Sequence, residues 1–295
     1  MQRIAAISAH AGAVYCLEQG RQRNTFFSGS ADKFVAEWNL HTFEQEKFTI
    51  KLEYTPYSLC YLKEKSRLLI GTSAGGIHVI DTTEKKEIRH LALHNQGIYD
   101  LKHIDTFDWF TAASGDGSIS VWNTTDFSLV KKINLSSQKI RTIAVNTETN
   151  RLVVGCGEGN IYSISIPELE VVNTIKAHQG SVYALNFESN NVLLSGGKDA
   201  HLNLWDFNTL TNIKSIPAHN FAIYSIQVLS ESNEWVTASR DKTIKRWNAQ
   251  DYTVKQRIDK NSAGHINSVN TILKHSYNNY LITASDDRQI LIWKQ

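Results

Sequence analysis

Three side-chain types that can together hydrolyse a bond, histidine, a hydroxyl residue and aspartate, recur as a set four times along the chain. In a serine hydrolase such a set activates the hydroxyl oxygen as a nucleophile. Each set here is completed by a tryptophan six positions after the aspartate, and the four sets are His10, Ser28, Asp32 and Trp38; His178, Ser195, Asp199 and Trp205; His219, Thr237, Asp241 and Trp247; and His265, Thr283, Asp287 and Trp293. A hydrolase needs one triad, so the fourfold recurrence at fixed spacing favours a structural role over a catalytic one.

The Asp–Trp pairs belong to a repeat that runs through the whole chain. A fifth pair, Asp116 and Trp122, has the same spacing, and two weaker copies place Ile80 and Ile164 at the tryptophan position. The seven positions are 38, 80, 122, 164, 205, 247 and 293, so the successive steps are 42, 42, 42, 41, 42 and 46 residues. A period of this length is typical of an array of small supersecondary units.

Within one repeat, the apolar pattern predicts four short strands. In the fifth repeat they cover about 180–187, 192–196, 201–206 and 211–216, separated by short turns rich in Gly, Asp and Asn. The fourth strand is more polar, as expected of a sheet edge, and no window shows a sustained apolar period of about 3.6 residues. Seven such units use the whole chain, so no second domain is predicted.

With this period and these Asp–Trp pairs, the chain resembles the WD40 family of β-propellers over essentially all of residues 1–295. The resemblance implies an all-β, seven-bladed propeller with four antiparallel strands per blade, forming a single domain. It also implies that the ring closes when the N-terminal segment 3–8 pairs with the last blade. In this family the repeated His, Ser or Thr, Asp and Trp form one buried hydrogen-bond chain per blade, which implies a scaffolding role for the four sets.

Three repeats depart from this pattern. The third keeps His94 and its Asp–Trp pair but has Ala112 where a Ser or Thr belongs, so we expect its hydrogen-bond chain to be broken. The second and fourth lack the His, Asp and Trp together, with Ala74 and Glu158 at the Asp position. We expect those two blades to be less stable and to be held mainly by apolar packing.

Function is expected on the loops and on the rim of the central channel, because the scaffold itself is fixed. In WD40 proteins the second residue of each innermost strand often lies near the upper rim. Here these positions hold Tyr15, Tyr57, Tyr99, Arg141, Tyr183, Tyr224 and Asn270. Tyr and Arg are frequent binding anchors, although tyrosines here also fit a packing role between neighbouring blades, and the sequence leaves both roles open.

A second set of rim positions directly precedes the turn aspartates, and it includes Lys198, Arg240 and Asp286. Together with Lys139 and Arg141, it places four cations on blades four to six. Because arginine can form two hydrogen bonds to a carboxylate or phosphate, we expect an acidic or phosphorylated partner. The longest repeat step predicts a four-residue insertion near 260–264, and we expect that loop to project from the same rim.

Charge and composition limit the function classes. Lys plus Arg total 31 and Asp plus Glu 29, a balance that argues against nucleic-acid binding through a basic surface. No apolar run is long enough to span a bilayer, and the N-terminus does not resemble a secretory signal. Three cysteines without a CxxC pair suggest reduced thiols in the cytoplasm.

The sequence therefore predicts a non-catalytic, monomeric interaction scaffold that binds a peptide or protein partner and needs no metal or cofactor. Two alternatives stay open. One is a propeller enzyme with a small-molecule or metal site at the channel mouth. The Tyr, Arg and Asn residues expected there are poor metal ligands, which argues against the metal site. The other is nucleic-acid binding through cations and stacked tyrosines.

Overall fold

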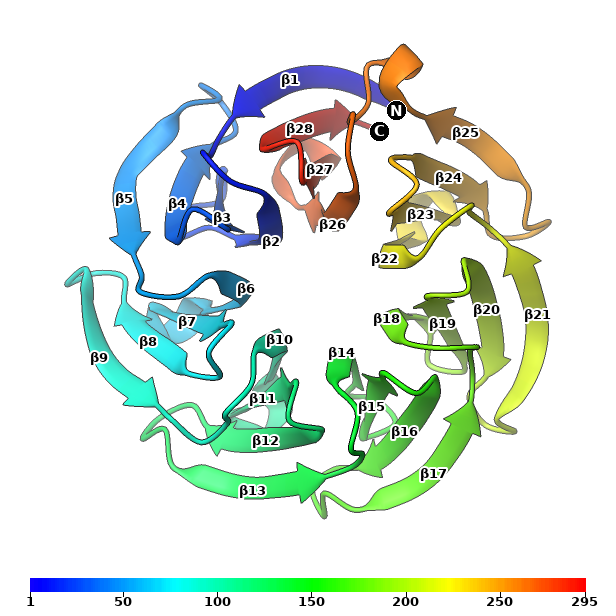
Figure 1. The fold of residues 1–295 in the computed structure, drawn as a ribbon, viewed down its shortest axis with the longest axis horizontal. Helices are drawn as coiled ribbons and strands as arrows, with labels where there is room; N and C mark the ends of the chain where they lie inside the picture. Colours follow the sequence, from blue (N-terminus) through cyan, green and yellow to red (C-terminus); the bar gives the residue numbers. More distant parts are fainter.

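The computed structural model describes all residues from Met1 to Gln295 and contains seven four-stranded antiparallel sheets arranged in a ring (Figure 1). The innermost strands are β2 (Val14–Gln19), β6 (Pro56–Leu62), β10 (Ile98–Ile104), β14 (Ile140–Asn146), β18 (Val182–Ser189), β22 (Ile223–Leu229) and β26 (Val269–His275). The second strands are β3 (Thr25–Ser30), β7 (Arg67–Thr72), β11 (Trp109–Ser114), β15 (Arg151–Cys156), β19 (Val192–Gly197), β23 (Glu234–Ser239) and β27 (Tyr280–Ser285).

The outer half of each sheet has the same order. The third strands are β4 (Phe34–Asn39), β8 (Ile77–Asp81), β12 (Ser118–Asn123), β16 (Asn160–Ser165), β20 (His201–Asp206), β24 (Ile244–Asn248) and β28 (Gln289–Lys294). The outermost strands are β5 (Gln45–Lys51), β9 (Lys86–Leu91), β13 (Leu129–Asn134), β17 (Val171–Lys176), β21 (Thr211–Pro217), β25 (Val254–Ile258) and β1 (Gln2–Ser8). Short 3-10 turns are η1 (Lys63–Lys65), η2 (Asp105–Phe107), η3 (Ser230–Ser232), η4 (Lys260–Ser262) and η5 (Tyr277–Asn279).

The ring is closed by the two ends of the chain. β1 pairs antiparallel with β28, from Gln2 opposite Lys294 to Ser8 opposite Gln289, and supplies the fourth strand of the last blade. Figure 1 shows the two termini beside each other at this blade. The predicted seven-bladed architecture and its closure are confirmed. Blades are numbered below from the sheet β2–β5, so that the closing sheet is blade seven.

The apolar core is divided into seven clusters, each lying between two neighbouring blades. The second strands contribute most, because both of their faces are covered: every residue of β3 and β23 is buried. The outermost strands face solvent, and six of the seven residues of β21 are exposed. This gradient explains why the predicted strands become more polar from the inner to the outer edge of a blade.

Strand direction gives the ring two distinct faces. Turns between second and third strands, and loops from each outermost strand to the next innermost strand, lie on one side, which we call the upper face. The predicted insertion lies on this side and forms η4. It does not project from the channel rim, however: it packs at the outer edge of the ring beside β1 (Figure 1), where Nη1 of Arg3 donates to the carbonyl of Ala263 at 2.8 Å.

Candidate interaction site at the channel mouth

A bulge near the start of every innermost strand turns one side chain toward the centre of the ring. The register between first and second strands shifts across the second residue of the innermost strand, for example between Val14 and Cys16 and between Ile140 and Thr142. The other five blades shift at the same place. A bulge leaves its extra residue unpaired and redirects that side chain. The residues so presented, called the collar below, are Tyr15, Tyr57, Tyr99, Arg141, Tyr183, Tyr224 and Asn270.

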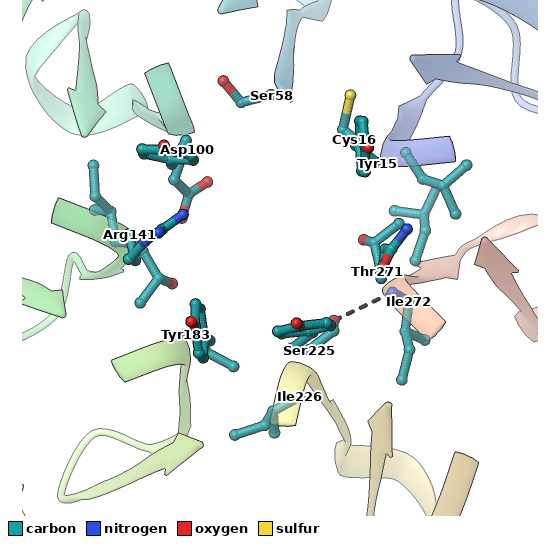
Figure 2. Close-up of a pocket in the computed structure, with 18 of the residues that line it drawn as sticks. Tyr15, Cys16, Ser58, Asp100, Arg141, Tyr183, Ser225, Ile226, Thr271 and Ile272 are labelled. Carbon is teal, nitrogen blue, oxygen red and sulfur yellow. Dashed lines mark hydrogen bonds between the residues drawn. The ribbon is translucent and has the colours of Figure 1, made fainter. Parts of the chain in front are cut away.

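The collar surrounds the opening of a central cavity of about 260 Å³ (Figure 2). Its tyrosines contact one another. Tyr57 stacks on Tyr99 with ring centres 5.4 Å apart, and Tyr15 meets Tyr57 edge-on at 5.6 Å. Across the opening, Tyr183 meets Tyr224 edge-on at 5.1 Å. The aromatic rings thus form two packed groups, and Arg141 stands between them.

Arg141 lies between two aromatic rings and has no ion-pair partner. Its guanidinium carbon is 4.2 Å from the ring centre of Tyr99 and 5.5 Å from that of Tyr183. Its Nε atom is buried and makes no hydrogen bond. Buried N–H groups in folded proteins almost always have an acceptor, so Arg141 holds a donor for which the protein itself supplies none.

Asn270 closes the collar on the opposite side, and its amide nitrogen makes two hydrogen bonds. Its amide nitrogen donates to the carbonyl of Val14 at 3.0 Å and to Oδ1 of Asp286 at 2.8 Å. Burial and the nearby Asp286 carboxylate raise the pKa of Tyr15 above its usual value. The collar is therefore electrically asymmetric, with a free cation at Arg141 and a carboxylate at Asp286.

Below the collar, polar side chains tie each blade to the next. Ser58 donates to the carbonyl of Ile98 at 2.9 Å, and Asp100 accepts from the Ile143 amide at 2.8 Å. Ser225 accepts from the Ile272 amide at 3.2 Å, the bond drawn as a dashed line in Figure 2. One carboxylate in this layer, that of Glu18, also lines the cavity. Burial raises the pKa of Glu18 to about 7.

Three further cations named from the sequence lie on upper-face loops: Lys139 before β14, Lys198 between β19 and β20, and Arg240 between β23 and β24. Lys139, Lys198 and Arg240 are all exposed, and none forms an ion pair. The Nζ atom of Lys139 is 5.8 Å from the ring centre of Tyr99, and the guanidinium carbon of Arg240 is 6.0 Å from that of Phe221. The neighbouring turn carboxylates Asp199 and Asp241 are already bound by histidines, which leaves these cations free.

Each of the four repeated sets forms one continuous hydrogen-bond network. In blade one, Nδ1 of His10 lies 2.9 Å from Asp32, Nε2 lies 2.7 Å from the Ser28 hydroxyl, and the Trp38 indole donates to the same hydroxyl at 2.7 Å. The corresponding contacts join His178, Asp199, Ser195 and Trp205; His219, Asp241, Thr237 and Trp247; and His265, Asp287, Thr283 and Trp293.

Burial lowers the pKa of His10 and His219, which favours the neutral imidazole in blades one and six. In the neutral ring of these two blades, Nδ1–H donates to the aspartate and Nε2 accepts the hydroxyl proton, while the hydroxyl oxygen accepts the indole N–H. Burial opposes ionisation of Asp199, but its bond from His178 and backbone amides lower its pKa to about 2. Ser28, Ser195, Thr237 and Thr283 are fully buried, so no substrate can reach their hydroxyls.

Blade three also has a complete network, so the expectation of a broken chain is wrong. Ser120 of β12 takes the place of the missing hydroxyl: it lies 2.8 Å from Nε2 of His94 and accepts the Trp122 indole N–H at 2.7 Å. Ser120 pairs directly opposite Ala112, whereas in blade one Ser28 pairs opposite Ala36. Serine and alanine have exchanged strands on the same rung of the sheet.

Blade four uses a different set of polar contacts. Glu158, at the turn aspartate position, accepts hydrogen bonds from the Tyr162 hydroxyl at 2.7 Å and from the Asn160 amide at 2.9 Å. Blade two has no such network, and apolar residues such as Leu69, Ile77 and Val79 fill its interior. That these two blades are the least stable remains a prediction.

No group of three or more His, Cys, Asp or Glu side chains is arranged to hold a metal ion. None of the helical turns has the length and apolar character needed to cross a bilayer. The three cysteines, Cys16, Cys60 and Cys156, are free and buried.

Comparison with known proteins gives one family. The model of the WD40 family, described as "WD domain, G-beta repeat", matches residues 1–39, 85–123, 169–206, 210–248 and 258–294. The first three strands of blades two and four fall outside these matches, in agreement with their divergent turns. Among solved structures, the WD40 β-propeller domain of Doa1 is similar with a TM-score of 0.86 and 20% identity, over 100% of this chain and 97% of that one.

Two curated relatives match nearly the whole chain. A striatin homolog of Dictyostelium discoideum is 23% identical over 97% of this chain and 34% of its own length. The nuclear distribution protein nudF of Emericella nidulans is 26% identical over 97% of this chain and 60% of its own length. The chain thus spans about a third and three fifths, respectively, of the length of these two relatives.

Proposed function

This chain belongs to the WD40 family, and we propose that residues 1–295 act as one non-catalytic interaction module that binds a protein or peptide partner around the channel mouth. Interaction scaffolds are common in this family, but a fold alone does not specify a function. The proposal therefore depends on the collar and the rim cations of this particular chain.

The observation that carries the proposal is the state of Arg141. A buried guanidinium donor without an acceptor costs about 1–3 kcal/mol of folding free energy. A bound partner that supplies the missing acceptor would recover this cost. Lys139, Lys198 and Arg240 are exposed on upper-face loops of blades four to six and have no ion-pair partners. An acidic or phosphorylated residue of the partner would neutralise these cations and bond Arg141.

Catalysis finds no support in the polar residues of the chain. The repeated hydroxyls are buried, and each one is hydrogen-bonded to both a histidine and a tryptophan. The collar offers phenols, one guanidinium and one amide, and the amide of Asn270 is already bonded. We therefore assign the module a binding role and place it in the cytoplasm, where its free cysteines would remain reduced.

The proposal is tested by affinity capture from the native cell followed by mass spectrometry. Wild-type protein is compared with Arg141→Ala/Arg240→Ala, which removes two upper-face cations. The matched control is Arg23→Ala/Lys85→Ala, which removes two exposed cations from loops on the opposite face. We expect at least one partner to be lost from the first variant and retained by the control, while both melt as wild type does. A partner profile unchanged in the first variant would contradict the proposal.

A further inference from the structure

A second cavity, of about 410 Å³, lies on the upper face between blades six and seven and shares no residue with the collar. Its walls come from the β23–β24 turn, the end of β25, and the insertion that contains η4 (Figure 1). The insertion that lengthens the last repeat therefore builds one wall of this groove. The other blades lack such a wall, because their corresponding loops are shorter.

The charge that this groove presents to solvent is positive. Lys242, Arg257 and Lys260 line it, and neither Lys242 nor Lys260 makes an ion pair or a side-chain hydrogen bond. Arg257 faces Asp259 only at 3.4 Å.

The two carboxylates in the groove are already occupied. Asp241 lies 3.0 Å from His219 Nδ1 and accepts from the Asn220 amide at 3.0 Å and from the Thr243 hydroxyl at 2.6 Å. Asp259 accepts from the Asn261 amide at 2.9 Å. Three cations against two carboxylates leave the groove with one net positive charge, and its two unpaired charged side chains, Lys242 and Lys260, are both cations.

One exposed apolar side chain lines this groove, and a second follows Asn220, whose backbone amide donates to the groove residue Asp241. Ile266, which lines it, is 61% exposed, and Phe221, on the loop that leads into blade six, is 57% exposed. These are the two most exposed large apolar side chains of the protein. Large apolar groups left in water next to a cavity often mark a binding surface.

Arg240 joins the turn that lines the groove to the loop that leads into the collar. The backbone amide of Arg240 donates to the carbonyl of Ala222 at 2.9 Å, and its guanidinium lies over Phe221. Ala222 leads to the collar residue Tyr224, and Arg240 is followed by Asp241 and Lys242 of the groove. A chain bound at the channel mouth could follow this line of residues outward.

We infer that the groove between blades six and seven binds an extended acidic segment of the partner, with apolar residues of that segment packed on Phe221 and Ile266. The inference rests on the proposed function, because the segment is taken to continue from the channel mouth. Three strand spacings of about 4.8 Å separate the inner and outer strands of a blade, and four or five extended residues at about 3.4 Å each span that distance. The recognised sequence is thus short, with acidic and apolar residues interleaved.

The probe is a phage-displayed library of random dodecapeptides, selected on the immobilised full chain. The most enriched peptide is synthesised with a fluorescein label, and its Kd is measured by fluorescence anisotropy. The groove variants are Lys242→Glu/Lys260→Glu and Phe221→Ser/Ile266→Ser. The matched control is Lys33→Glu/Lys47→Glu, which reverses two exposed charges on blade one, with Lys33 at the turn position of Lys242. Arg141→Ala reports on the collar.

We expect enrichment of Asp and Glu interleaved with apolar residues, and at least a tenfold rise in Kd for each groove variant against less than twofold for the control. Peptides that bind the groove variants as tightly as wild type, but lose affinity with Arg141→Ala, would overturn the inference and leave the proposed function standing. Peptides insensitive to every variant, or a selection that enriches nothing, would contradict both.

Discussion

The Ser120 hydroxyl lies 2.8 Å from Nε2 of His94 and closes the hydrogen-bond network of blade three from the third strand rather than the second. Since Ser120 is the cross-strand neighbour of Ala112, the hydroxyl occupies the place that it has in the other networks. The buried network thus specifies a position in space, which either of two paired residues can fill.

Ser120→Ala should destabilise the protein by about 1–3 kcal/mol, because it leaves the Trp122 indole N–H and Nε2 of His94 without a partner inside the blade. Urea unfolding followed by tryptophan fluorescence measures the change. Ser215→Ala is the control, since Ser215 is exposed and makes no side-chain hydrogen bond. A loss no greater than that of the control would mean that the network contributes nothing in this blade.

The sequence predicted the blades, their strands and the ring closure, because the Asp–Trp spacing recurs in five units and the repeat length and strand pattern extend through all seven. It did not predict Ser120, since a position-by-position comparison looks for a hydroxyl in one strand only; a search for Ser–Ala exchanges eight residues apart would have found it. It located the insertion near 260–264 but not its place at the outer edge. That place depends on a long-range bond between Arg3 and Ala263.

The contribution of ring closure to stability can be tested with two residues of β1. Ile7 of β1 is 7% exposed and packs in the cluster between blades seven and one, whereas Ile4 is 36% exposed. Ile7→Ala should lower the free energy of unfolding by about 2–4 kcal/mol, and Ile4→Ala by less than about 1 kcal/mol. Equal effects of the two substitutions in urea unfolding would show that β1 does not secure the ring through its buried face.

The buried histidines should make stability depend on pH. Burial lowers the pKa of His219 in the folded protein, so below about pH 6.5 the unfolded chain binds a proton that the folded chain resists. This group therefore costs stability as the pH falls from 7.5 to 5.5. His219→Gln should shrink the difference in unfolding free energy between these two pH values. His41→Gln, on an exposed loop, is the control, and identical differences in both variants would refute the assignment.

Glu18 should have the opposite pH dependence from His219, with its contribution to stability lost as the pH rises. Its pKa is raised to about 7 by burial, against about 4.3 in an unfolded chain. The folded protein therefore holds this proton more tightly, and the stabilisation is complete below about pH 4 and lost as the pH rises through 7. Glu18→Gln cannot ionise, so it should unfold at higher urea than wild type at pH 8, with the gap closing near pH 4. Glu53→Gln, exposed on the upper face, controls for the change in net charge.

Substitution of Arg141 should affect partner binding much more than the stability of the fold. Arg141→Leu loses contacts with two tyrosine rings, worth about 0.5–2 kcal/mol, but also removes the buried unpaired Nε donor, a cost of similar size. Its free energy of unfolding should stay within about 1 kcal/mol of wild type while partner capture is lost. Arg21→Leu is the contrast, because Arg21 pairs with the buried Glu37 at 2.6 Å, and its loss should destabilise without affecting capture. If Arg141→Leu instead unfolds early and still captures every partner, Arg141 is a packing residue, and the binding site lies elsewhere.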